Sequence, residues 1–154
     1  MRKIQPGDIF QVNLSNEEIS YIQYIKQDIY YLDSDLIRIY NYRNIKKLSL
    51  DELINIDFIQ YYRTWIKHGI KNKILQKMGN IKLESNIKIP LFKQENSDLL
   101  SENKWIVWDN DGNKKFFKEL PVQYENLPLA SIVEPSFLVK IIELGHHPWD
   151  PHKK

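Results

Sequence analysis

The first part of the chain alternates between turn residues and short β-type runs, and this pattern limits the folds that it can adopt. Pro6-Gly7 breaks regular structure, and a run of alternating apolar and polar residues follows at 10–14. Further runs rich in β-branched and aromatic residues lie at 19–25, 29–32 and 36–42. The spacing predicts an N-terminal antiparallel meander.

Two helices have clear end signals in the sequence. Ser49 at the N-cap and Glu52 three residues later form a capping box, which predicts a helix over 50–56. Pro135 suits the first position of a helix and Gly145 suits the position after its last turn, with an apolar stripe between them. We therefore expect a mid-chain helix and a C-terminal helix.

The middle of the chain has weaker signals. The aromatic and β-branched segment 58–66 favours a strand, although its length also permits a helix. Met78-Gly79-Asn80 predicts a loop, and the polar segment 93–103 predicts an exposed excursion. A second hairpin is predicted over 105–117, because Asp111-Gly112 supplies the positive φ angles of a tight turn.

Length and composition complete the prediction of the fold. The chain has 154 residues, as is typical of one domain, and it has no cysteine, so disulfides and thiolate metal sites are excluded. We expect a single α+β domain over 1–145 and a C-terminal tail over 146–154. The mid-chain and C-terminal helices would accompany a curved, mostly antiparallel sheet of about seven strands. The N-terminal half of this sheet could be curved enough to resemble a barrel.

The sequence predicts a cytoplasmic protein that does not enter a membrane. No segment approaches the ~18 consecutive apolar residues of a membrane span, and the N-terminus lacks the apolar core of a signal peptide. The formal net charge of +2 indicates no particular class of partner.

Charge is nevertheless unevenly distributed along the chain. No acidic residue lies between Asp57 and Glu84, whereas the segment from Glu95 to Asp111 is predominantly acidic. The basic segment contains Arg63, Lys67, Lys71, Lys73, Lys77 and Lys82. Either the two segments pair with each other, or the basic one steers an acidic partner.

Residue patterns typical of catalysis and of metal binding are weak. The sequence has no phosphate loop and no nucleophile elbow, and His68 is the only histidine outside the C-terminal segment. Residues 109–112 resemble the start of a calcium loop, but the acid required at its twelfth position is missing. His146, His147 and His152 could offer imidazoles to Zn²⁺ or Ni²⁺, but the neighbouring prolines argue against a preformed site. We expect no metal, no cofactor and no enzymatic activity.

Aromatic residues are the better indication of function. The chain has nine tyrosines and four tryptophans, and adjacent pairs such as Tyr30 and Tyr31 point to opposite faces of a strand. One of each pair is then exposed, which is typical of a protein-binding face, while a second packed layer or a homodimer is the alternative. The candidate partner-binding residues are Tyr24, Tyr31, Tyr62, Arg63, Trp65, Trp108, Asp109 and Asp111.

Several short fragments occur in a characteristic order. They are Pro6-Gly7-Asp8-Ile9-Phe10 and the segments 39–43, 48–53, 78–80, 89–94 and 133–135. This order resembles that of the bacterial immunity protein 26 family, although 21–25 lacks the glycine and 74–77 lacks the tryptophan usual there. The resemblance implies a cytoplasmic antidote, encoded beside a polymorphic toxin, that neutralises a cognate toxin domain by binding it and performs no chemistry.

Two alternatives come from other classes of protein. Gly7-Asp8-Ile9-Phe10 also resembles the opening of MazF-type toxins, and the basic segment contains Arg63 and Thr64, so a MazF-like RNA-cleaving enzyme is the first. A non-catalytic nucleic-acid-binding module is the second, although the near-neutral net charge argues against a nucleic-acid partner.

Overall fold

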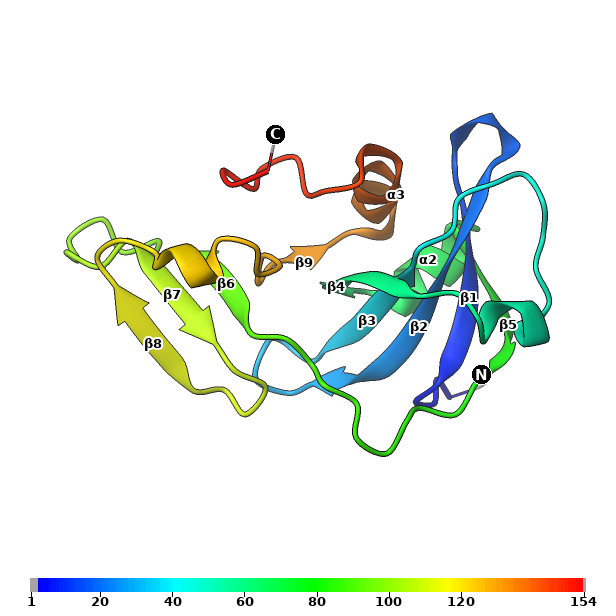
Figure 1. Ribbon diagram of the computed structural model, residues 1–154, viewed down its shortest axis with the longest axis horizontal. Helices are drawn as coiled ribbons and strands as arrows, with labels where there is room; N and C mark the ends of the chain where they lie inside the picture. Colours follow the sequence, from blue (N-terminus) through cyan, green and yellow to red (C-terminus); the bar gives the residue numbers. More distant parts are fainter. Residues whose placement is uncertain (1–2, 154) are drawn as a thin grey trace.

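The computed structural model describes residues 3–153 and consists of two β-sheets with accompanying helices (Figure 1). The strands are β1 (Asp8–Asn13), β2 (Ile19–Asp28), β3 (Ser34–Tyr40), β4 (Phe58–Thr64), β5 (Leu75–Asn80), β6 (Phe92–Glu95), β7 (Trp105–Trp108), β8 (Lys114–Phe117) and β9 (Ile132–Val133). The larger sheet has the order β5-β1-β2-β3-β4-β9, and only its β4–β9 pair is parallel. The smaller sheet, β6-β7-β8, is antiparallel. The predicted α+β class is confirmed.

The helices are α1 (Leu50–Leu53), α2 (Ile66–Lys71) and α3 (Pro135–Leu144), with 3₁₀ turns η1 (Ser15–Glu17) and η2 (Val122–Tyr124). The predicted capping box is present: the Glu52 N–H donates to Ser49 Oγ at 3.2 Å, and the Ser49 N–H donates to Glu52 Oε1 at 3.1 Å. Helix α1 nevertheless ends before the predicted residue 56. Helix α3 is confirmed, and Gly145 follows it with a φ of 84°.

The predicted strand at 29–32 is wrong. Strand β2 continues to Asp28, and the chain then reverses through residues 29–33. The Tyr30 N–H donates to Asp28 Oδ1 at 3.0 Å, and Leu32 has a φ of 55°, which is incompatible with an extended strand. The aromatic and β-branched residues of this segment therefore lie in a turn.

Two other local predictions need correction. The segment 58–66 is a strand only as far as Thr64, after which Ile66 begins helix α2, which the sequence analysis did not predict. The predicted loop at 78–80 is the end of β5, which pairs with β1. Within the described residues there are thus nine strands and three α-helices, more than the expected numbers.

The larger sheet does not close into a barrel within the described residues, because β5 and β9 lie at opposite ends of its strand order. The barrel-like form of the prediction is therefore not adopted. Among residues 3–153, no helix is both long enough and apolar enough to cross a membrane.

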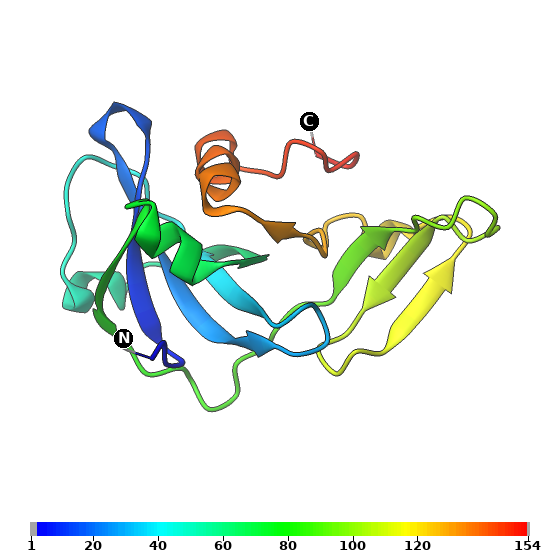
Figure 2. The same ribbon diagram turned by 180° about the vertical axis from the view of Figure 1, so that it is seen from behind.

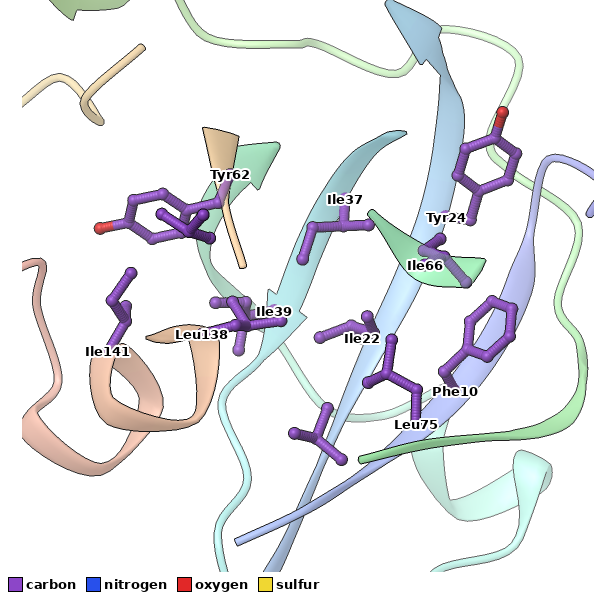
Figure 3. Close-up of a cluster of buried hydrophobic side chains, with 12 residues drawn as sticks. Phe10, Ile22, Tyr24, Ile37, Ile39, Tyr62, Ile66, Leu75, Leu138 and Ile141 are labelled. Atoms are coloured by element: carbon purple, nitrogen blue, oxygen red, sulfur yellow. The ribbon is translucent and has the colours of Figure 1, made fainter. Parts of the chain in front are cut away.

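Both faces of the larger sheet are buried. Phe10 of β1 and Ile39 of β3 lie in one core with Leu138 and Ile141 of α3, and these side chains are seen together in Figure 3. Ile9, the neighbour of Phe10 on β1, lies in a second core that includes residues around α1. Neighbouring residues of one strand are both buried because helices and loops cover both faces.

The smaller sheet lies beside the larger one and is joined to it by a buried cluster and by connecting segments (Figures 1 and 2). Phe92 of β6 forms a third buried cluster with Ile25 and Leu36 of the larger sheet. The connecting segment 81–91 runs along one side, where Glu84 accepts two hydrogen bonds from the Arg38 guanidinium at 2.7 and 2.8 Å. Strand β9 and the C-terminal segment run along the other side (Figure 1).

Candidate functional site

Three adjoining hollows lie where the smaller sheet meets β9 and the C-terminal segment. Their volumes are about 500, 240 and 290 Å³, and all three share Ser131. We call them together the joint groove. The residues that define it are Tyr30, Tyr31, Leu32, Trp108, Ser131, Ile132, Phe137, His147 and Trp149.

Several large apolar side chains of the joint groove face solvent. The exposed fractions are 54% for Tyr30, 77% for Leu32 and 76% for Trp149. Ile29, which precedes Tyr30 in the same turn, is also exposed. Exposed apolar side chains gathered around one groove are typical of an interaction site, whereas single scattered apolar residues are not.

Tyr31 and Trp108 hold the two sheets together at the centre of the groove. Their rings meet edge to face, with centroids 5.6 Å apart. The Tyr31 hydroxyl donates to the Ala130 carbonyl, and Trp108 Nε1 donates to Gln94 Oε1 at 2.6 Å. Burial raises the pKa of the Tyr31 hydroxyl, so this group remains a hydrogen-bond donor at neutral pH.

A buried ion pair between Arg63 and Asp28 supports the contact between Tyr31 and Trp108. Arg63 Nε donates to Asp28 Oδ2 at 2.7 Å, and both residues are almost fully buried. The guanidinium carbon lies 4.0 Å from the centre of the Phe92 ring and 5.0 Å from that of Tyr31. Because Asp28 also accepts the Tyr30 N–H, the same pair fixes the turn that presents Tyr30.

The C-terminal segment forms the far wall of the groove. His147 is buried between aromatic rings, with centroids 5.2 Å from Phe137 and 5.7 Å from Trp149. Burial lowers the pKa of the His147 imidazole, so this side chain is neutral at physiological pH. The Tyr62 ring lies on the same imidazole, at 6.1 Å.

Lys93 anchors this segment to the smaller sheet. Its fully buried ammonium donates to Asp150 Oδ1 at 2.7 Å, to the Glu125 carbonyl at 2.6 Å and to His152 Nδ1 at 2.9 Å. All three protons of the ammonium therefore have acceptors. Within residues 146–153, His147 and Asp150 are buried and hold the segment against the protein, whereas residue 154 of the predicted tail lies outside the described residues.

The structure brings four of the sequence-predicted residues to one region. Tyr31 and Trp108 line the joint groove, and Asp109 and Asp111 lie in the turn that follows Trp108. That turn contacts the groove, because a Cβ atom added to Gly112 would lie 2.7 Å from Tyr30 Cδ1. The acidic turn therefore forms one rim of the groove.

The other four predicted residues do not line the joint groove. Tyr24, Tyr62 and Arg63 are buried, with exposed fractions of 7%, 4% and 2%, and they form part of the cores and of the ion pair. Trp65 is half-buried at the start of α2, where its ring lies 6.2 Å from His68. We therefore leave these four out of the joint groove.

Sequence reasoning missed the most exposed residues of the groove. Tyr30 was recognised only as the neighbour of Tyr31, and Leu32, Ile132, Phe137 and Trp149 were not selected at all. Trp149 had one signal in the sequence that could have indicated its exposure. It lies in a proline-rich segment, where no regular helix or strand would bury its side chain. The contact between residues 31 and 108 has no local signal in the sequence.

A separate pocket of about 370 Å³ lies between β4, the 126–128 loop and the C-terminal segment. His146 and Asp150 line it, but His147 and His152 are bonded elsewhere. Within residues 3–153, no three histidine, cysteine or acidic side chains come together in a way that could hold a metal ion.

The basic and acidic segments do not pair with each other. Among the described residues, Lys77 pairs with Asp8 and Arg63 pairs with Asp28, and no ion pair joins the basic segment to residues 95–111. Arg63 and Lys77 of the basic segment are therefore held by acids outside residues 95–111, and buried Arg63 does not face a partner.

Comparison of the chain with protein-family models, with curated proteins and with solved structures gave no match.

Proposed function

We propose that this chain is an immunity protein that binds a cognate toxin domain in the cytoplasm and blocks it without performing any chemistry. The joint groove is the observation that carries the proposal. It combines exposed aromatic and aliphatic side chains with a support of buried hydrogen bonds and ion pairs, which is the arrangement of a preorganised binding surface. The ordered fragments that resemble the immunity protein 26 family supply the class of partner.

The groove also suggests how the binding energy is distributed. Tyrosine and tryptophan are the usual central anchors of protein interfaces, because a rigid ring buries a large area at little entropic cost. Tyr30 and Trp149 line neighbouring hollows of the groove and take this role. Asp109 and Asp111 on the rim would set the orientation and the association rate.

The proposal predicts that Trp149→Ala and Tyr30→Ala weaken binding to the toxin domain encoded by the neighbouring reading frame. Each truncation of a central anchor should cost about 2 kcal/mol or more, which corresponds to a roughly 30-fold higher Kd. Calorimetry with the two purified proteins measures this directly. Both side chains are mostly exposed, so the free energy of unfolding should change little.

Ile54→Ala is the matched control, because Ile54 is exposed at the opposite end of the larger sheet, next to α1. It should bind the toxin as the wild-type chain does. The proposed function fails if the wild-type chain neither binds the toxin domain nor protects cells that express it. The groove assignment fails if both groove variants bind as tightly as Ile54→Ala.

The MazF-like alternative gains no support from the geometry. Arg63 is held by Asp28, and the buried Thr64 hydroxyl donates to the Val133 carbonyl at 2.6 Å. Neither side chain is presented to an RNA substrate. We expect the purified chain to leave RNA intact and its expression to be harmless to cells.

A further inference from the structure

The loop between β6 and β7 exposes two adjacent leucines. Leu99 and Leu100 have exposed fractions of 89% and 96%, more than any other large apolar side chain reported for the described residues. The loop between β6 and β7 lies at the end of the smaller sheet that is farther from α3 (Figure 1). This tip is separate from the joint groove.

Hydrogen bonds hold the loop in one conformation. The Asn96 N–H donates to the Lys104 carbonyl at 2.8 Å and closes the base of the loop. Asp98 Oδ1 accepts the Leu100 N–H at 3.0 Å, and the Asp98 carbonyl accepts the Ser101 N–H at 3.2 Å. The leucines are therefore presented on a formed turn, so a partner pays less ordering entropy on binding.

The loop that carries the two leucines has acidic residues and no basic residue between Lys93 and Lys104, which flank it. Glu95, Asp98 and Glu102 lie in the segment 94–103, which contains no lysine or arginine. None of these acids takes part in the ion pairs of the described residues. An exposed apolar tip with an acidic surround complements an apolar depression with a basic rim.

We propose that Leu99 and Leu100 insert into an apolar pocket of the toxin domain. The rim of that pocket would carry lysine or arginine side chains, and this contact would be made in addition to the one at the joint groove. This inference rests on the proposed function. The charge pattern favours a protein over a membrane, because the acids beside the leucines are repelled by anionic lipid headgroups.

The test compares Leu99→Ser/Leu100→Ser with the control Val122→Ser, since Val122 is also well exposed but lies on η2 outside the loop. The double variant should raise the Kd for the purified toxin domain at least about 30-fold, as expected for loss of a central anchor. The control should leave the Kd unchanged. Both variants should keep the wild-type unfolding midpoint, because the replaced side chains are exposed.

A second variant tests the charge. Asp98→Asn/Glu102→Gln keeps the acceptor that Asp98 supplies to Leu100 but removes two negative charges. It should slow association with the toxin and flatten the dependence of the association rate on salt, with a smaller effect on dissociation. Stopped-flow measurements at low and high salt would resolve the two rates.

The outcomes separate this inference from the proposed function. A wild-type chain that does not bind the toxin overturns both. Tight binding by the wild type and equally tight binding by Leu99→Ser/Leu100→Ser overturns only the loop contact. Two further outcomes, each with toxin affinity unchanged by the leucine substitutions, also overturn the loop contact. Leucine-dependent binding to vesicles of phosphatidylglycerol would assign the tip to a membrane. Leucine-dependent self-association would assign it to a second copy of the chain.

Discussion

At the scale of single residues, the protein buries several charges and pairs each of them. Lys93, Arg63 and Arg38 are almost fully buried, and their partners are Asp150, Asp28 and Glu84. Removing a charge from water costs several kcal/mol, so each pair is stable only while both partners are present. Deleting one partner is therefore more harmful than neutralising both.

Lys93→Met should destabilise the fold by about 3 kcal/mol or more, because it leaves the buried Asp150 carboxylate without its counter-charge. Adding Asp150→Asn should restore part of this loss, since the amide still accepts the His152 N–H that Asp150 Oδ1 accepts at 2.9 Å. Urea denaturation of both single variants and the double variant measures the coupling between the two sites. Strictly additive losses would contradict the pairing.

Glu84 should make stability depend on pH in the acid range. Its hydrogen bonds with Arg38 lower its pKa from 4.5 to about 2 in the folded protein. The stabilisation is fully present above the unfolded pKa of 4.5 and is lost as pH falls toward the folded pKa of about 2.

Glu84→Gln should therefore lower the free energy of unfolding at about pH 7 by only about 1 kcal/mol, because the carboxylate is half exposed and solvent screens the pair. The difference between variant and wild type should shrink at about pH 3. Urea denaturation at both pH values measures it. A difference that is the same at both values would contradict the assignment.

At the scale of elements, the C-terminal segment depends on a neutral histidine. Burial lowers the pKa of His147 below its ordinary value of 6.5, so protonation favours states in which the imidazole is released to water. Asp150 opposes this shift and His146 adds to it. Stability should consequently fall as pH drops below about 6.5, the opposite of what a raised histidine pKa would produce.

His147→Phe should remove this dependence while keeping the aromatic packing against Phe137 and Trp149. The wild type should lose more stability than the variant between about pH 7.5 and about pH 5. Chemical denaturation at the two pH values provides the comparison. An equal loss in both chains would place the titrating group elsewhere.

At the scale of the whole molecule, the two sheets are joined by a few contacts and by segments that cross between them. The C-terminal segment follows α3, which covers the larger sheet. Its Asp150 pairs with Lys93 of the smaller sheet. A chain that stops after Gly145 lacks Asp150 and leaves Lys93 buried without its counter-charge. The smaller sheet should then open well before the larger one.

Hydrogen exchange measured by mass spectrometry would test this. In the chain that stops after Gly145, residues 92–117 should lose protection while β1, β2 and β3 keep theirs. A chain that stops after His152 is the control, because it retains Asp150 and His152. Equal protection of the smaller sheet in both truncated chains would contradict the role of the C-terminal segment.

Short-range signals were sufficient for the elements whose cause is local. The capping box at Ser49 and the proline and glycine that bracket α3 formed as predicted. The second hairpin formed too, although only Gly112 of the Asp-Gly pair has a positive φ, at 83°. Each depends on interactions within a few residues, which the sequence specifies directly. The α+β class followed from the same signals.

The joint groove was only partly predictable. Tyr31 and Trp108, two of the candidate residues, line the same hollow, but Tyr24, Tyr62 and Arg63 are buried. Alternation along a strand separates its two faces, but it does not say whether either face is covered. Here helices, loops and the smaller sheet cover both faces of the larger sheet.

By itself, the sequence determined the capped start of α1, the ends of α3, the second hairpin and the absence of cysteine chemistry, because those depend on residue type and on neighbours along the chain. Only the tertiary structure decided which aromatic residues meet solvent and that the C-terminal segment packs as a wall of the groove. Lys93 and Asp150 are separated by 57 positions, and Tyr31 and Ala130 by 99. Contacts at such separations arise from the packing of the two sheets, so no local pattern in the sequence records them.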